Sequence, residues 1–244
     1  MIFLEKRKRL QKGKTLSFDA TPNSYDTHLK YKPEYFVNAI LIHPSYFPSI
    51  LQMTAVSQAK QVVLEVAGNY QKQTYRNRTY IAHNNGTLLL NIPIKHNKDR
   101  SRRQMRATEV ENDFPWQLHH WKSIQTAYRT SPFFEYYEDD IKHIFTKPAS
   151  NLLELNLEIF DLVCDLLGME TVVSKTLIYQ RKPEILDLRP LIEIKVKRNF
   201  QFQPYTQVLQ EHHGFLPNLS VLDLLFNEGP NALHYLETQK LTFD

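Results

Sequence analysis

The chain has 244 residues, 42% of them hydrophobic, so it can bury a core, and one globular domain is the simplest expectation. Its formal net charge of +4 reflects 30 lysines and arginines against 26 acidic residues. The single cysteine excludes an intramolecular disulfide and a multi-cysteine zinc site, and we expect no metal site. No apolar run approaches the roughly 18 residues of a membrane span, and a secretory signal pattern is missing, so we expect a cytoplasmic protein.

The first part of the chain differs from the rest. Residues 1–36 are polar, contain two prolines and show no sustained apolar period, which predicts a flexible or loosely docked extension before a single domain at 37–244.

Basic residues form two clusters, one at Glu5–Arg9 and one at Lys95–Arg106. Because no helix-turn-helix, zinc finger or RNA-binding aromatic motif accompanies them, we interpret the second cluster as a solvated loop and do not expect nucleic-acid binding.

The domain opens with a strand, a loop, a helix and a second strand. Val37–Ile42 is a short apolar run that predicts a strand, and the loop that follows, His43–Pro48, contains two prolines that end it. Ser49–Lys60 has helical spacing, and Gln61–Ala67 is a second apolar run. This order is typical of parallel strands joined by a crossover.

A hairpin is expected next along the chain. A short strand at Tyr80–Ile81, a turn at Asn84–Gly86 and a strand at Thr87–Ile94 follow one another. Proline at position 93 places the end of that last strand at a sheet edge or a bulge.

The middle of the chain is predicted to be helical. Trp116–Tyr128 has helical spacing, and Ser131 with its following proline is expected to cap another helix. Asn151–Leu167 is the clearest helix, with Gly168 suited to its C-terminal cap. Cys164 lies beside its apolar face, which indicates a buried structural thiol rather than a nucleophile.

Two further elements complete the prediction. Thr176–Tyr179 is expected to form a strand, and Ser220–Asp223 opens a short helix that Gly229 and Pro230 end. The fold class is therefore α/β: an opening β-loop-α-β unit with a mixed sheet, a mainly helical middle and a short C-terminal helix.

The polar segment Tyr70–Arg78 is the most informative candidate for binding. It holds two tyrosines, a lysine and two arginines within nine residues, directly after the predicted second strand. Lysine supplies a mobile charge and arginine a planar fork that grips an oxyanion with two hydrogen bonds. Open α/β sheets bind ligands where strands end, so we expect a phosphate or carboxylate site, the alternative being a solvated loop.

Other polar sets have equally plain alternatives. The loop His43–Pro48 precedes a helix N-terminus, where N–H groups favour anions, or it is only a proline-stiffened connection. His120 is a candidate general base or a core or surface histidine. Asp223 is a candidate proton-transfer group or a capping carboxylate, and Asp187 and Arg189 either pair with each other or face a ligand. The sequence lacks several standard catalytic motifs: glycine-rich phosphate loops, dinucleotide fingerprints, nucleophile elbows and zinc-protease helices. This weighs against standard kinases and dehydrogenases. No cofactor is identified.

Three motifs resemble the WbqC-like family, a bacterial group associated with O-antigen and other surface-polysaccharide loci, and the match is closest to a short Bacteroidetes-type form. They are the loop His43–Pro48, the segment Tyr70–Arg78 and the stretch Gly214–Pro230, with further matches at Trp121–Ile124, Ala127–Tyr128 and Ser131–Phe134. The resemblance covers roughly residues 38–235. The first loop departs from the family pattern, because His43 takes the place of a glutamine.

The resemblance implies an enzyme of surface-polysaccharide biosynthesis that transfers a group, such as an aminoacyl or nucleotidyl group, from an activated, phosphate-bearing sugar, nucleotide or aminoacyl donor. The alternative is a non-catalytic module that binds an anionic glycan precursor or an assembly partner. The catalytic candidates are His213, Asp223 and His120. The expected substrate-binding residues are Tyr46, Lys72, Tyr75, Arg76, Asn77, Arg78, Lys95, Arg189, Tyr205, Gln207 and Asn227.

Overall fold

The structure is a computed structural model that describes residues 37–96, 103–194 and 200–241. The chain divides into two units, Met1–Lys32 and Pro33–Asp244, and every described residue belongs to the second. The predicted extension at 1–36 and the centre of the basic cluster Lys95–Arg106 therefore lie outside the described residues. The domain boundary at Val37 stays a prediction.

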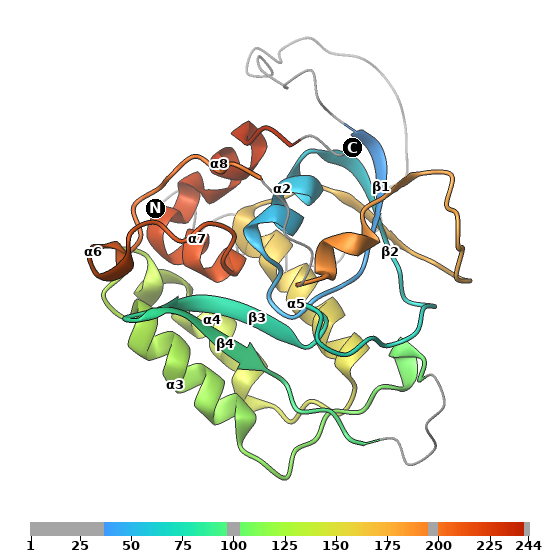
Figure 1. The fold of residues 1–244 in the computed structure, drawn as a ribbon, viewed down its shortest axis with the longest axis horizontal. Helices are drawn as coiled ribbons and strands as arrows, with labels where there is room; N and C mark the ends of the chain where they lie inside the picture. The colour runs from blue at the N-terminus through green and yellow to red at the C-terminus, as the bar shows by residue number, and fades with distance from the viewer. Residues whose placement is uncertain (1–36, 97–102, 195–199, 242–244) are drawn as a thin grey trace, which may run out of the picture. The chain divides into compact units, whose positions relative to one another are not determined.

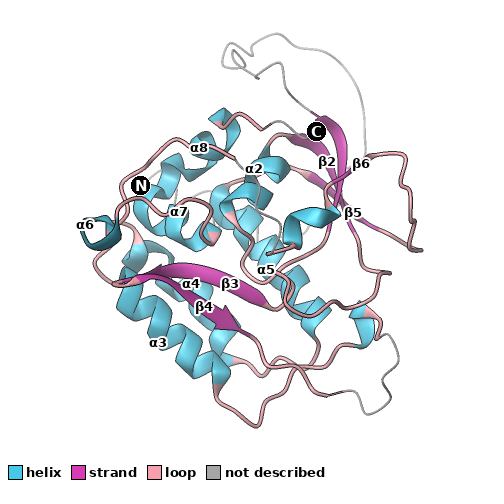
Figure 2. Ribbon diagram, in the orientation of Figure 1, coloured by secondary structure: helices cyan, strands magenta, loops and turns pink. Residues whose placement is uncertain are grey.

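A parallel sheet forms the base of the candidate site. The strand β1 (Val37–Ile42) leads through a loop to the helix α2 (Ile50–Ser57), which leads to the strand β2 (Ala59–Leu64). β1 and β2 pair in parallel, and β5 (Val172–Lys175) and β6 (Leu186–Asp187) extend the sheet in the order β5-β2-β1-β6. The expected β-loop-α-β unit is confirmed (Figures 1 and 2).

The border between the first helix and the second strand differs from the prediction. α2 ends at Ser57 and β2 begins at Ala59, two residues before the expected start at Gln61. Gln58 is the C-terminal cap of α2, and its side-chain amide donates to the backbone carbonyls of Leu236 and Gln239, at 3.1 and 2.7 Å. β2 starts at Ala59 because this residue is paired with Val37 of β1.

The predicted hairpin is confirmed and forms a second sheet. β3 (Arg78–His83) pairs antiparallel with β4 (Gly86–Asn91), and Asn84 and Asn85 make the turn. Gly86 has φ +111°, a backbone conformation that favours glycine. Parallel and antiparallel strands are thus both present but lie in separate sheets, and the hairpin packs on the helix α3 (Trp116–Tyr128) (Figure 1).

The helical middle follows the predicted order. After α3 come α4 (Phe134–Thr146) and α5 (Leu152–Leu167), and α4 contacts both of its helical neighbours. The Asn151 side chain accepts hydrogen bonds from Leu153 N and Glu154 N, and Gly168 ends α5 in the left-handed conformation, as the sequence predicts. Ser131 does not cap α4, because that helix begins at Phe134 and the Ser131 hydroxyl has no partner within the described ranges.

The thiol of Cys164 is half-buried beside the apolar face of α5. Burial, together with the charges of Asp161 and Asp165, raises the pKa of this thiol to about 12. It stays protonated at neutral pH, which agrees with a structural role.

One predicted strand is wrong. Thr176–Tyr179 is a loop, and the strand lies just before it as β5, because Val172–Lys175 pairs residue by residue with Gln61–Leu64. The apolar side chains of the loop face solvent, and Leu177 is 91% exposed. The prediction from the apolar run alone therefore placed this strand at the wrong residues.

The C-terminal part covers the first loop. It contains α6 (Gln210–His213), α7 (Val221–Glu228), a 3₁₀ turn at Gly229–Asn231 and α8 (Ala232–Thr238). Two other 3₁₀ turns lie earlier in the chain, at Met105–Ala107 and Arg189–Ile192. α7 begins after its cap Ser220 and ends at Gly229, as predicted. The part of the chain that the structure describes has no helix of the length and apolar character that crossing a membrane requires.

Candidate functional site

A cavity of about 700 Å³ opens at the carboxyl end of the parallel sheet. His43 follows β1, Gly68 follows β2, and Asp187 ends β6, and all three line the cavity. Arg76, from the segment Tyr70–Arg78, lines it as well. Ligands of open α/β sheets bind at this edge because the loops that leave the strands converge there.

Arg76 and His43 form the inner wall of the cavity. The Nη2 atom of Arg76 lies 2.8 Å from Nε2 of His43. A guanidinium group only donates, so Nε2 accepts and the ring proton resides on Nδ1. Burial, and secondarily the charge of Arg76, lowers the pKa of His43 to about 3, although the backbone carbonyl of Glu65 acts in the opposite direction. His43 is therefore neutral at physiological pH.

Two other donors of Arg76 are unpaired in the part of the chain that the structure describes. Its side chain is buried, the residue being only 3% exposed, and Nε and Nη1 have no hydrogen-bond partner among the described residues. Burial lowers the pKa of Arg76 to about 10, so the group remains charged at neutral pH. A buried cation with unpaired donors beside a cavity is costly unless an anion enters.

Arg189 is arranged differently, because two carboxylates neutralise it. Its Nη2 and Nε atoms lie 2.6 and 2.8 Å from the two carboxylate oxygens of Asp187, and Nη1 lies 3.3 Å from Glu65 Oε2. Hydrogen bonding to Arg189 lowers the pKa of Asp187. Glu65 is fully buried and also accepts from Ala67 N and Thr176 Oγ1. The pair that the sequence suggested between Asp187 and Arg189 is present.

Backbone hydrogen bonds fasten the two motifs to each other. Tyr46 N donates to Tyr75 O at 2.9 Å, and the amide of Asn156 donates to the carbonyls of Pro44 and Arg76. Phe47, in the same loop, has φ +42°, which is strained for an aromatic residue. The fold thus holds His43–Pro48 against Tyr70–Arg78.

Four other residues of the segment Tyr70–Arg78 lie away from the cavity. Arg78 Nε and Asn77 Nδ2 both donate to Asn91 Oδ1 across the hairpin, at 3.0 and 3.2 Å. Lys72 is exposed, and Tyr75 is half-buried against Tyr80 with its pKa raised to about 12, mainly by burial. None of the four lines the cavity.

Lys95, another expected anion ligand, is exposed and pairs with Glu109 at 3.0 Å. Lys95 does not line the cavity. The basic residues that the sequence groups together are therefore dispersed over the molecule. Of the basic residues in Tyr70–Arg78, Arg76 lines the cavity, and two of its donors have no partner among the described residues.

Tyr46 and His120 lie in the core. Tyr46 is fully buried, its hydroxyl is 2.8 Å from Nδ1 of His120, and its ring packs edge-on against Phe47 and Trp116. Burial lowers the pKa of His120 to about 4. Both residues have aromatic neighbours and neither lines the cavity.

The C-terminal candidates form a separate buried network. The hydroxyl of Tyr205 and the amide of Gln207 donate to Oδ2 of Asp223, and Asn227 donates to the Asp223 carbonyl at 2.7 Å. Burial raises the pKa of Asp223. His213 is half-buried on α6, with Nδ1 2.7 Å from the carbonyl of Gly214. This network docks the segment that precedes α7 onto that helix.

Sequence reasoning missed several cavity residues, among them Tyr179, Glu193 and Gly68. Tyr179 was hidden because its segment was predicted to be a strand, and Glu193 and Gly68 had no motif around them. An added Cβ on Gly68 would lie 3.4 Å from the Tyr179 ring and 3.6 Å from His43, so a side chain at this position would fill space beside both residues. The position of residue 68, just after a strand, was the available signal.

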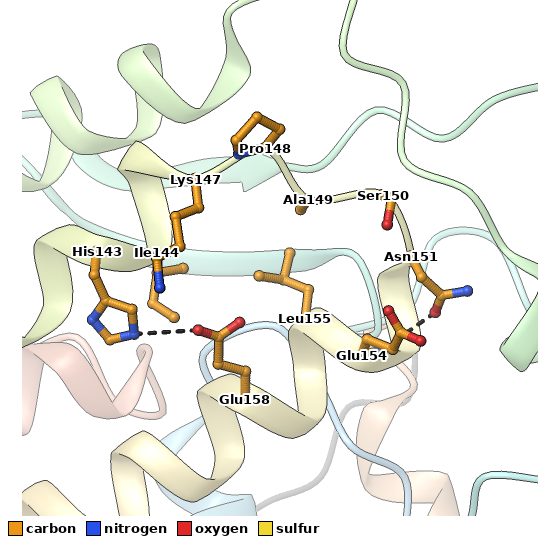
Figure 3. A pocket seen from close by; sticks show the side chains of 10 residues that line it. All are labelled: His143, Ile144, Lys147, Pro148, Ala149, Ser150, Asn151, Glu154, Leu155 and Glu158. Atoms are coloured by element: carbon orange, nitrogen blue, oxygen red, sulfur yellow. Dashed lines mark hydrogen bonds and ion pairs between the residues drawn. The ribbon is translucent and has the colours of Figure 1, made fainter.

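A smaller pocket lies between the end of α4 and the start of α5 (Figure 3). Its volume is about 120 Å³, His143 lies 3.3 Å from Glu158, and Asn151 caps α5. The charged residues that line it are exposed or half-buried, so it offers no buried charge and the larger cavity is the better candidate.

Comparisons with known proteins agree with the motif pattern. The model of the WbqC-like protein family matches residues 43–195 and 184–235. A protein of Mycobacterium tuberculosis (strain ATCC 25618 / H37Rv), "Uncharacterized protein Rv1507c", is 24% identical over 223 residues, which cover 80% of this chain and 96% of that protein. No solved structure matches the chain. Because the family model spans most of the described residues, the chain belongs to the WbqC-like protein family.

Proposed function

We propose that the protein binds a small anionic molecule beside Arg76 and transfers a group from it, as a cytoplasmic enzyme of surface-polysaccharide biosynthesis. The observation that carries the binding step is the buried guanidinium of Arg76, whose Nε and Nη1 lack partners among the described residues. An oxyanion would supply both the missing hydrogen bonds and the missing countercharge. The transfer step and the pathway rest on the family's association with surface-polysaccharide loci.

The activated donor in this proposal is a sugar, a nucleotide or an aminoacyl compound. Arg76 grips its oxyanion, His43 holds the guanidinium in place, and Arg189 keeps Glu65 and Asp187 from competing for Arg76. Tyr70 and Tyr179 line the cavity and offer ring surface to the rest of the ligand.

A second candidate is a non-catalytic module that binds an anionic glycan precursor or an assembly partner. The observation that favours it is the position of the proposed proton-transfer residues His213, Asp223 and His120, none of which lines the cavity. His43 does line it, but a pKa of about 3 makes this histidine a weak base at neutral pH.

Thermal unfolding with candidate donors tests the binding step. Nucleoside triphosphates, nucleotide sugars and aminoacyl donors are screened, and a ligand at 100 times its Kd should stabilise the protein by about 2.7 kcal/mol. Arg76→Met should abolish the stabilisation, whereas Arg129→Met, an exposed arginine outside the cavity, should retain it. A hit that Arg76→Met still binds would show that the site lies elsewhere.

Product analysis with the same hit separates the two candidates. Turnover of the donor supports the transferase, whereas saturable binding without turnover for any donor and acceptor supports the binding module. Asp223→Asn and His213→Gln are included, because the binding module requires neither side chain for affinity.

A further inference from the structure

The charges around the cavity limit which anions it can hold. Arg189 is neutralised by Asp187, both of whose carboxylate oxygens it engages, and by Glu65. Arg189 therefore has little capacity for a ligand. Among the described lining residues, the arginines without an ion pair are Arg76 on the inner wall and Arg181, which is exposed.

Glu193 places a negative charge in the same cavity. Its side chain is half-buried, and its carboxylate has no hydrogen bond or ion pair with any residue that the structure describes. Its backbone forms a bridge with Thr74, two residues before Arg76. Burial lowers the pKa of Arg76, and the charge of Glu193 offsets a part of this shift. Among the described residues, Arg76 thus has donors and Glu193 an acceptor without a partner, and both residues line the cavity.

We infer, building on the proposed function, that the cavity takes a compact ligand with one oxyanion group flanked by hydroxyl or ammonium donors, and that it disfavours polyphosphates. A carboxylate or a single phosphoryl group accepts from Nε and Nη1 of Arg76, and the neighbouring donors bind the carboxylate of Glu193. Sugar acids, sugar monophosphates and amino acids share this chemistry.

The physical basis of the selectivity is like-charge repulsion. One oxyanion matches the single charge of Arg76. Each further phosphate adds negative charge in a cavity that already contains the carboxylate of Glu193, which has no partner among the described residues. Glu193 accepts a charge-assisted hydrogen bond from a hydroxyl or an amine of the ligand, and it repels a second phosphate. It therefore strengthens the binding of compact ligands and weakens the binding of polyphosphates.

Calorimetric titration of the full chain tests the inference with five probes: D-glucuronate, glucose 1-phosphate, glycine, glucose and tripolyphosphate. At least one of the first three should bind, and binding should require Arg76. Glucose, which has no oxyanion, should not bind. Tripolyphosphate should bind about tenfold more weakly than the best compact probe. Which compact probe binds best distinguishes the carboxylate, phosphoryl and amino-acid sources.

Glu193→Gln provides the decisive variant, with Glu211→Gln, an exposed glutamate on α6, as the matched control. Glu193→Gln should reduce the difference in affinity between tripolyphosphate and the best compact probe, and the control should leave this difference unchanged. Three results would overturn the inference. They are tighter binding of tripolyphosphate than of every compact probe in the unaltered protein, an unchanged ratio of the two affinities in Glu193→Gln, and no binding of any compact probe. Binding that Arg76→Met leaves intact refutes the proposed function itself.

Discussion

The side chain of Asn156 donates a hydrogen bond to the backbone carbonyl of Arg76 at 2.7 Å, across 80 residues of sequence. The same amide donates to the carbonyl of Pro44 at 3.3 Å. Asn156 is fully buried on α5, so one side chain of the helical middle fixes the backbone of both motifs that form the inner wall of the cavity.

Replacing Asn156 should therefore loosen both loops. We expect Asn156→Leu to lower the free energy of unfolding by about 2–4 kcal/mol, because two buried carbonyls each lose a partner. Urea denaturation measures the change, with Asn231→Leu, at an exposed asparagine whose side chain makes no capping hydrogen bond, as the control. A loss no larger than in the control would contradict this role.

Arg76 should lower the stability of the protein when no ligand is bound. Arg76→Met removes a buried charge with unpaired donors, so we expect the free energy of unfolding without ligand to stay equal or to rise by about 1–2 kcal/mol. The rise is limited because Nε2 of His43 loses its partner. If urea denaturation shows a loss of stability beyond about 2 kcal/mol, Arg76 is a structural residue and the anion site loses its main support.

His43 should make stability sensitive to acid. Its pKa is lowered from 6.5 to about 3 in the folded protein, so the unfolded chain binds the proton more readily. The resulting stability is complete above pH 6.5 and is lost progressively as the pH falls toward 3. We expect His43→Gln to reduce the decrease in the free energy of unfolding between pH 7 and 5, whereas His212→Gln, an exposed histidine on α6, should not.

His43→Gln also separates hydrogen bonding from titration. A glutamine carbonyl can accept from Arg76, so ligand affinity should be retained, and His43→Leu, which cannot accept, should weaken binding about tenfold. Calorimetric titration with the ligand identified by the screen measures both. Equal affinities of the glutamine and leucine variants would show that His43 does not position Arg76.

The ion pairs of Arg189 and Lys95 should differ in their importance. Arg189→Met leaves the buried carboxylate of Glu65 without its cation, and we expect a loss of about 3–5 kcal/mol in the free energy of unfolding. Lys95→Met breaks an exposed pair with Glu109 and should leave stability unchanged. Urea denaturation of the two variants side by side tests the contrast. Similar results would contradict a structural role for the ion pair between Arg189 and Glu65.

Local patterns in the sequence predicted much of the fold. The apolar period and the caps of Asn151–Leu167 identified α5 with its ends, and the asparagine pair before Gly86 identified the hairpin, because both elements satisfy their hydrogen bonds within a short stretch of chain. The short strands β5 and β6 were missed or misplaced, since each is held by a partner strand distant in sequence.

The candidate site was predicted only in part. Residue types and their position after a strand drew attention to Arg76, to the loop that begins with His43 and to the pairing of Asp187 with Arg189. By itself the sequence determined these short-range patterns and the family. Only the tertiary structure decided that Arg78 and Lys95 have partners while Nε and Nη1 of Arg76 have none among the described residues. The physical reason is that a charge is paired or left free by side chains brought from other parts of the chain, and no local pattern encodes those contacts.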